Sequence, residues 1–187
     1  MPGLPTATGG NAIACIVSAD PARLAWRILA DMEIGIGGNM AKAEPGPASG
    51  LLTYRGAVYP ANCDHMGHMN VASYVAKFDE ASWCLFCELG LTPSYLRGPQ
   101  FGMAGVQQNI SYRQELFPGD VMEVRSRVLE IGDRRIRFEH TMYNLERGEV
   151  AAVCELTAVH LDKIAHKSCP FPAAVRAAAQ ALLAAGG

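Results

Sequence analysis

Apolar residues between positions 71 and 89 recur every three or four residues, the period of one face of an α-helix. The set comprises Val71, Tyr74, Val75, Phe78, Ala81, Leu85 and Leu89. Asn70 is a suitable N-cap for this segment, and Gly90 is a suitable stop at its end. The pattern therefore predicts one long helix of about five turns that must bury a broad apolar face.

Beyond residue 100 the pattern changes to alternation of apolar and polar positions, which is typical of strands with one buried face. Turn signals rich in Gly, Pro and Asp separate the alternating segments. We expect strands at residues 103–113, 121–130, 134–144 and 149–162, and another before the helix at 51–59. An Ala-rich tail at 173–185 is predicted to be helical.

The order of these elements predicts an α+β fold. A long helix can bury its apolar face only against a surface as large as itself, and the concave face of the antiparallel sheet is the one available. A curved antiparallel sheet of five to six strands wrapped around one long central helix is the hotdog fold. We expect residues 51–187 to form this domain.

Residues 1–50 have a different composition, with eight of the 19 glycines and five of the 11 prolines. Such a segment favours a flexible extension over a packed core. Asp20-Pro21 is a good helix start, so residues 22–33 are a candidate short helix. A second interpretation is that translation begins at Met40, in which case the first 39 residues do not belong to the protein.

Composition narrows the class of protein. The formal net charge of −2 gives no global attraction to nucleic acid or to an anionic membrane. No apolar run approaches the ~20 residues of a transmembrane helix, and no basic residue precedes Arg23 as a signal peptide would require. We expect a cytoplasmic protein with reduced thiols. Cys84 and Cys87 fall within the predicted helix with no second pair, so they are interpreted as ordinary thiols.

The densest polar cluster, Asn62 to Asn70, lies in the loop that leads into the predicted helix. A helix N-terminus presents unpaired N–H groups and the positive end of the helix dipole, which suit a developing oxyanion. A carboxylate a few residues before that end can face the same point. The pair meets the needs of acyl transfer from a thioester: one group attacks or activates water, and the other holds the negative oxygen.

The stretch from Val58 to Tyr74, VYPANCDHMGHMNVASY, resembles the signature of the 4-hydroxybenzoyl-CoA thioesterase-like hotdog family. That signature is an Asp, a short gap, Gly-His, an apolar residue, Asn, and a Tyr in the first helical turn. Tyr112-Arg113 and the turn at residues 117–120 look like the family's strand and turn before its second long strand. The resemblance covers roughly residues 52–163.

The resemblance implies roles for four catalytic-site residues. Asp64 matches the acidic residue that acts as nucleophile or general base on the thioester carbonyl. Val71 matches the position whose backbone N–H binds the thioester oxygen. His68 and Asn70 match positions that orient the loop and the Asp through hydrogen bonds.

Five further residues are candidates for substrate binding. Gly67 permits the sharp approach to the helix, and Tyr74 is expected to pack under the site. His65 directly follows Asp64, where the best-studied members differ, and is either a proton shuttle or a wall of the acyl pocket. Arg134 and Arg135 are candidate contacts for CoA phosphates, the alternative being a solvated sheet face. Family members usually bind CoA across a subunit boundary, so these arginines would serve a neighbouring site.

The activity implied by the resemblance is hydrolysis of an acyl-CoA to the free acid and CoA, without a metal or redox cofactor. It also implies self-association as a dimer or tetramer. A similarity to thioesterases of carnitine and betaine breakdown suggests a small cationic acyl group. The alternatives are a non-catalytic hotdog protein that binds acyl-CoA, and a hotdog hydratase or dehydratase, which needs an Asp/His arrangement deeper in the helix.

The roles of the histidines and of three apolar residues depend on which distant segments pack against them. His65 and His68 lack an obvious third partner for a metal site. His140 lies on the apolar face of its predicted strand and is expected to be a core histidine, whereas His160 and His166 are expected to be peripheral. Candidates to line the acyl pocket are Phe101, Met103 and Met142.

Overall fold

The computed structural model of the chain describes residues 50–185. The predictions made for residues 1–49, including the candidate helix at 22–33 and the alternative start at Met40, lie outside this part. The elements in chain order are β1 (Leu51–Ala57), a short 3-10 turn (Pro60–Asn62), α2 (Val71–Glu88), α3 (Pro93–Arg97), β2 (Phe101–Tyr112), β3 (Val121–Ile131), β4 (Arg135–Asn144), β5 (Glu149–Asp162), β6 (Lys167–Ser168) and α4 (Ala173–Ala185).

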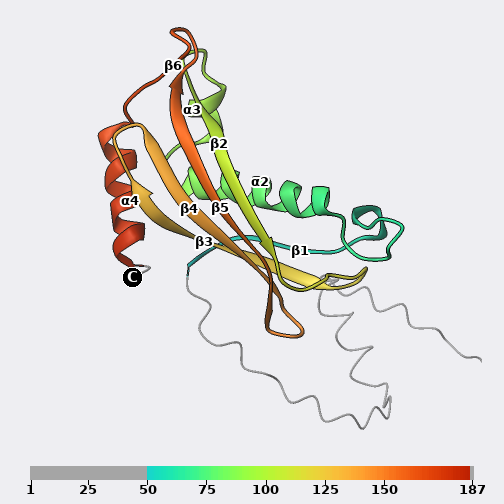
Figure 1. Ribbon diagram of the computed structural model, residues 1–187. Coiled ribbons are helices and arrows are strands. Elements are labelled where there is room, and N and C mark those ends of the chain that lie inside the picture. The colour runs from blue at the N-terminus through green and yellow to red at the C-terminus, as the bar shows by residue number, and fades with distance from the viewer. Residues whose placement is uncertain (1–49, 186–187) are drawn as a thin grey trace, which may run out of the picture. The chain divides into compact units, whose positions relative to one another are not determined.

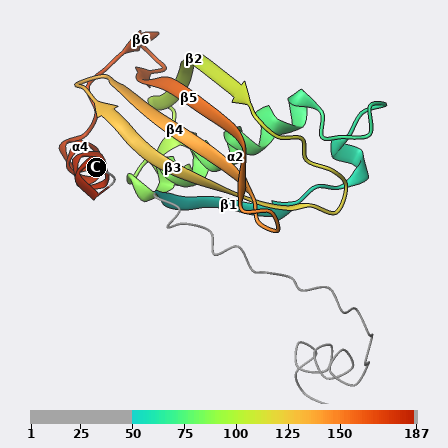
Figure 2. The same ribbon diagram turned by 60° about the horizontal axis from the view of Figure 1, so that its bottom comes forward.

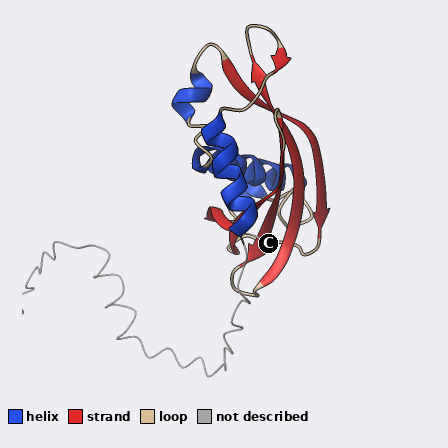
Figure 3. Ribbon diagram, turned by 90° about the vertical axis from the view of Figure 1, so that its left-hand side faces the viewer, coloured by secondary structure: helices blue, strands red, loops and turns tan. Residues whose placement is uncertain are grey.

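The strands form one curled antiparallel sheet of six strands. Its order is β1-β3-β4-β5-β2, with the short β6 paired to β5, and Figure 2 shows the strands fanned out in this sequence. Strands β1 and β2 are therefore the two edges. Figures 1 and 3 show that α2 and α4 lie on the same face of the sheet. The result is a half-barrel with few helices.

The alternation read from the sequence decides which side chains face the helices. The even-numbered apolar residues of β3 and β4 are buried, as predicted, and include Met122, Val124, Val128, Ile136, Phe138 and Met142. Helix α2 contributes a buried stripe to the same core, comprising Tyr74, Phe78, Ala81, Leu85 and Leu89.

Two positions of the predicted apolar face are not buried. Val71 is 58% exposed and Val75 is 38% exposed, so the expectation that they belong to the buried face was wrong. Val71 borders an open hollow at the start of α2. The stripe that is buried against the sheet is accordingly narrower at this end of the helix than the periodicity indicated.

The two buried histidines illustrate what the sequence could and could not predict. His140 is fully buried as expected, with Nε2 2.9 Å from Ser82 Oγ and Nδ1 2.6 Å from Ser126 Oγ. His160 was expected to be peripheral, and this was wrong, since it is 1% exposed. Its ring stacks against those of Tyr95 in α3, Phe101 in β2 and Phe171, which precedes α4.

Three elements were not predicted: the 3-10 turn at Pro60–Asn62, helix α3 and strand β6. Helix α3 begins with Thr92, whose side chain caps Tyr95 N–H, followed by Pro93, and these are ordinary helix-start signals inside a segment interpreted as a loop. Strand β6 is only two residues long. Within residues 50–185, no helix has both the length and the apolar character needed to cross a membrane.

Candidate active site

The loop between β1 and α2 forms a tight turn around Asp64. Asp64 N–H donates to His68 O at 3.2 Å, and Gly67 N–H donates back to Asp64 O at 3.0 Å. Gly67 has a φ of +84°, a left-handed conformation that glycine adopts without steric cost. Met69, which is 1% exposed, anchors the end of the turn in the core. The backbone thus presents Asp64 in the loop that leads directly into the start of α2.

Two donors hold the Asp64 carboxylate in place. Met66 N–H donates to Oδ1 at 2.9 Å, and Asn70 Nδ2 donates to Oδ2 at 2.8 Å. Asn70 is also the N-cap of α2, and its Oδ1 accepts from Ala72 N–H at 2.8 Å. Since one end of the Asn70 amide must accept and the other must donate, the orientation of the amide is determined. A single side chain therefore links the carboxylate to the mouth of the helix.

The backbone N–H of Val71 lies in the first turn of α2, where amides have no intrahelical acceptor. Within residues 50–185 it makes no hydrogen bond, whereas the N–H groups of Ala72, Ser73 and Tyr74 all donate to Asn70. The helix dipole adds positive potential at the same point. This free donor and the Asp64 carboxylate flank the same Asn70 side chain.

The surroundings favour the ionised form of Asp64. The hydrogen bond from Met66 N–H and then that from Asn70 hold the pKa of this carboxyl below its ordinary value of 3.8, and the nearby His68 and His65 add to the effect. Asp64 is therefore an anion at neutral pH, as a nucleophile or general base must be.

A hollow of about 320 Å³ opens beside the start of α2. It is bordered by His68, Met69, Val71, Tyr74, Tyr112, Arg113, Gln114 and Glu115. The rings of Tyr74 and Tyr112 meet edge to face with their centroids 5.2 Å apart. Burial raises the pKa of the Tyr74 phenol, so it stays protonated and donates to Gln114 O at 3.3 Å. Val71, whose N–H is free, thus borders a space that has aromatic residues among its walls.

The two loop histidines occupy different places. His68 borders the hollow, with Nε2 3.7 Å from Glu115 Oε1 and Nδ1 3.4 Å from Met69 O. His65 is exposed at the tip of the turn. Within the part of the chain that is described, no three metal-binding side chains cluster together.

Several predicted contacts lie elsewhere. Arg134 and Arg135 are at the β3–β4 hairpin, separated from the Asp64 end of the sheet by the length of β3, roughly 35 Å for an extended strand of this size. Arg135 pairs with Glu130 at 2.8 Å. The structure therefore does not bring these arginines to Asp64 of the same chain.

None of the three candidates for the acyl pocket borders this hollow. Met142 is fully buried in the core, and Phe101 stacks on Tyr95. Met103 borders a separate small cavity beside Trp83. Tyr112 and Glu115, which border the hollow instead, lie at the end of β2 and just after it. In the sequence Tyr112 was interpreted as part of a strand, and Glu115 was not singled out.

Comparison with known proteins places these features in context. A family model described as the Thioesterase-like superfamily matches residues 58–179. Betainyl-CoA thioesterase of Pseudomonas aeruginosa is 27% identical over 132 residues, which are 71% of this chain and 83% of that protein. L-carnitine dehydrogenase/betainyl-CoA thioesterase of Agrobacterium fabrum is 30% identical over 112 residues, which are 60% of this chain but 23% of that longer protein.

Solved structures share the fold. The protein SAV2348 of Staphylococcus aureus in complex with CoA superposes with a TM-score of 0.70 at 20% sequence identity, covering 74% of this chain and 87% of that chain. The region matched by the family model begins just before the Asp64 loop and continues through α2 and the strands from β2 to β6.

Proposed function

This chain belongs to the thioesterase-like superfamily and is an acyl-CoA thioesterase, and from that premise we propose the chemistry of its site. The reaction is hydrolysis of a small acyl-CoA to the free acid and CoA. Asp64 acts on the thioester carbonyl, and Val71 N–H stabilises the oxyanion. The observation that carries this proposal is the Asn70 side chain, which holds the carboxylate at 2.8 Å and caps the helix that presents the free amide.

Two routes of hydrolysis are open to this arrangement. In the first, an Asp64 oxygen bonds to the carbonyl carbon, the C–S bond breaks, CoA leaves as the thiolate, and water hydrolyses the resulting anhydride. In the second, Asp64 takes a proton from water as the water oxygen attacks the carbonyl carbon, the C–S bond of the tetrahedral intermediate then breaks, and CoA leaves as the thiolate and takes up the proton. Both routes place negative charge on the carbonyl oxygen, where Val71 N–H and the helix dipole stabilise it. Neither route needs a metal or a redox cofactor.

Three variants test these roles in an assay of thiol release from a panel of acyl-CoAs. Asp64→Asn should lower kcat by about 10²- to 10⁴-fold, because it removes the base or nucleophile. Val71→Pro removes the N–H at the first helical position, where proline is tolerated, and Asn70 already has the extended conformation required before proline. We expect a loss of about 10²- to 10³-fold in kcat for Val71→Pro and little change for Val71→Ala, which keeps the amide.

Two results of this assay would contradict different parts of the proposal. Thiol release unaffected by Asp64→Asn would remove the mechanism while sparing the activity. Binding of acyl-CoA by the wild type without thiol release would identify a non-catalytic acyl-CoA-binding protein instead.

For the acyl group we propose a small cation, following the activity named for the two bacterial relatives. The support for this from the hollow beside Val71 is its aromatic wall, in which Tyr112 is 48% exposed and its ring can attract a quaternary ammonium. Glu115 and Arg113 both border the hollow, so Glu115 is the carboxylate available to a cation there. The test compares betainyl-CoA with 3,3-dimethylbutanoyl-CoA, a neutral group of the same shape. A value of kcat/KM about tenfold higher for the cation is expected, and equal values would refute the preference.

We also propose that a second copy of the chain pairs along β2. This strand is 12 residues long and is an edge of the described sheet, so one row of its backbone groups is available for pairing. Exposed apolar side chains lie on β2 and on α2, namely Val106, Tyr112, Val71, Val75 and Trp83. In this arrangement α2 is the central helix of each hotdog domain, and Arg134 and Arg135 would meet the CoA phosphates of a neighbouring copy.

Light scattering coupled to size exclusion tests this assembly. The wild type should have at least twice the chain mass, and Val106→Lys should shift it toward the monomer because an edge lysine opposes strand pairing. A monomeric wild type would contradict the proposal. A cytoplasmic location is part of the same proposal and is supported by the free thiols of Cys63, Cys84, Cys87, Cys154 and Cys169.

A further inference from the structure

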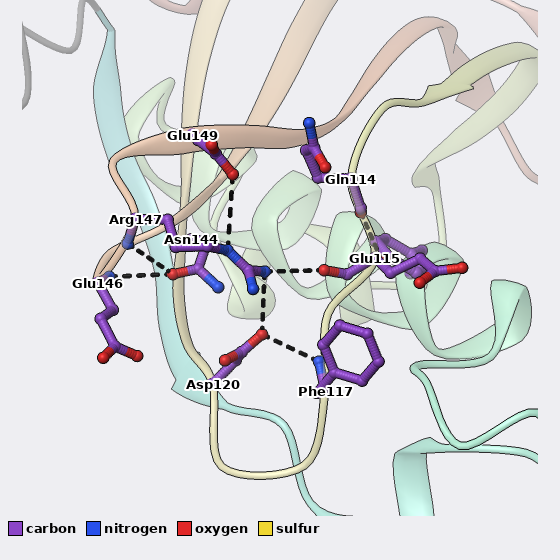
Figure 4. A network of polar contacts seen from close by, with 9 residues as sticks. Gln114, Glu115, Phe117, Asp120, Asn144, Glu146, Arg147 and Glu149 are labelled. Atoms are coloured by element: carbon purple, nitrogen blue, oxygen red, sulfur yellow. Dashed lines mark hydrogen bonds and ion pairs between the residues drawn. The ribbon is translucent and has the colours of Figure 1, made fainter.

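The turn between β4 and β5 lies beside the segment that supports the Asp64 loop, as Figure 4 shows. We infer that Arg147, in this turn, is a positioning residue for the active site: its guanidinium clamps residues 115–120, and that segment in turn holds the Asp64 loop at both ends. The inference rests on the proposed function of Asp64.

The loop that carries Asp64 is attached to residues 116–120 at two points. At its far end, Met69 N–H donates to Leu116 O at 2.7 Å. At its near end, Val58 N–H donates to Asp120 O and Gly119 N–H donates to Val58 O, both at 2.9 Å. Since Met69 directly precedes Asn70, a displacement of this segment moves the side chain that orients the Asp64 carboxylate.

Arg147 grips this segment at its start and at its end. One guanidinium nitrogen donates to Glu115 O at 2.8 Å and lies 3.3 Å from Asp120 Oδ2 (Figure 4). The same carboxylate oxygen accepts from Phe117 N–H at 2.9 Å, which closes the turn. The Asp120 side chain is only 14% exposed. A charge-assisted contact that is partly shielded from water holds geometry better than an open surface ion pair does.

The turn that carries Arg147 is itself constrained. Asn144 Oδ1 accepts from the N–H groups of Glu146 and Arg147 at 3.0 and 3.1 Å. Asn144 is fully buried, and its Nδ2 has no hydrogen-bond partner in the described part of the chain. A buried amide with one unpaired end is costly, so its retention here is explained by the turn that its oxygen closes. Glu149 Oε2 lies 3.5 Å from Arg147 Nε and orients the guanidinium from the other side.

The same segment shapes the hollow. Gln114 and Glu115 border it, and Gln114 O accepts from the Tyr74 hydroxyl at 3.3 Å. Arg147 does not border the hollow or approach Asp64, so its effect on the reaction must pass through the backbone of residues 115–120.

The test compares Arg147→Ala with Arg176→Ala as a matched control. Arg176 makes an ion pair of the same length, 3.3 Å to Asp133, on α4. Two readouts need no activity: titration of the Asp64 carboxyl by carbon NMR, and hydrogen exchange of the Met69 amide. In Arg147→Ala we expect the Asp64 titration to move to higher pH and Met69 exchange to quicken, because Asn70, which follows Met69, no longer holds the carboxylate as firmly. We also expect kcat/KM to fall about tenfold.

Arg147→Lys keeps the charge but not the guanidinium geometry, so it should fall between wild type and Arg147→Ala in both NMR readouts. It also supplies the measurement if Arg147→Ala does not fold. The inference is overturned if the Asp64 titration and the Met69 exchange of the Arg147 variants match those of Arg176→Ala. A wild type that releases no thiol would instead contradict the proposed function, because the NMR readouts do not depend on turnover.

Discussion

Asn70 performs two tasks with one amide, and substitutions can separate them. Its Oδ1 caps α2 by accepting from Ala72 N–H, and its Nδ2 donates to Asp64 Oδ2. Asn70→Ala removes both contacts. Asn70→Ser keeps a capping oxygen but is too short to reach Asp64. Asn70→Asp keeps the cap and places a second carboxylate where the donor stood, 2.8 Å from the first.

The stability of Asn70→Ala and Asn70→Ser should follow the cap. Loss of an N-cap costs about 1 kcal/mol of the free energy of unfolding, so Asn70→Ala should be destabilised by that amount. Serine is an equally good cap, so Asn70→Ser should stay within a few tenths of a kcal/mol of the wild type. Asn70→Asp also keeps the cap, but the repulsion between its carboxylate and that of Asp64 should lower its stability at neutral pH. Thr92→Ala, which removes the cap of α3, is a control for a lost cap away from the site.

Catalysis should follow the contact with Asp64 instead. Without the Asn70 donor the carboxylate loses part of its orientation, and kcat/KM should fall about tenfold to a hundredfold in both Asn70→Ser and Asn70→Ala. In Asn70→Asp two adjacent carboxylates cannot both ionise readily, so the pKa of the pair rises and activity should recover as the pH is raised.

Chemical denaturation and steady-state thiol release over a range of pH measure the two effects independently. The expected pattern is a stable but impaired Asn70→Ser, an unstable and impaired Asn70→Ala, and an unstable but fully active Thr92→Ala. If Asn70→Ser retained the kcat/KM of the wild type while Asn70→Ala lost it, the cap alone would matter. The bridge to Asp64 would then have no catalytic role.

Three further predictions follow from burial, backbone conformation and charge. Burial lowers the pKa of His140 from 6.5 to about 3, so below pH 6.5 the unfolded chain takes up a proton that the folded chain cannot. Between pH 7 and pH 5 this lowers the free energy of unfolding by about 2 kcal/mol, a loss that should be absent in His140→Gln by denaturant titration. Gly67→Ala meets no atom within 4 Å but must keep a φ of +84°, so its free energy of unfolding should fall by about 1 kcal/mol; no loss would indicate that the turn rearranges. The hydrogen bonds of Asp64 lower the pKa of its carboxyl, so protonation of this group should not reduce the kcat/KM of the wild type as the pH drops from 7 toward 3.8. If kcat/KM does fall in this range, and the pH of the fall changes in Asn70→Ser, the assignment is contradicted.

The elements with short-range signals were largely predictable. Asn70 and Gly90 bound α2 within one residue because capping depends on neighbours in the chain. The alternation in β3 and β4 identified their buried faces because successive side chains of a strand point to opposite sides. Asp64 was singled out because a recognisable loop motif and a helix start are adjacent in sequence.

Other features depended on which distant segments meet. His160 was misjudged because α3 and the segment that precedes α4, not its own strand, decide its burial. Val71 follows the helical period but borders a hollow. Nothing local to Arg147 indicates that it reaches Glu115 and Asp120, which lie 32 and 27 positions away.

The strands, the long helix with its cap, and the motif that predicts a carboxylate near a helix N-terminus can all be recognised from the order of residues along the chain. The link through Asn70, the place of Tyr112 and Glu115 beside the hollow, and the position of Arg134 and Arg135 at the far end of the sheet emerge from the folded chain. These two sets of features differ in the range of the interactions that produce them. Periodicity and capping arise from interactions over a few residues, whereas the register of the strands brings together side chains that no local pattern connects.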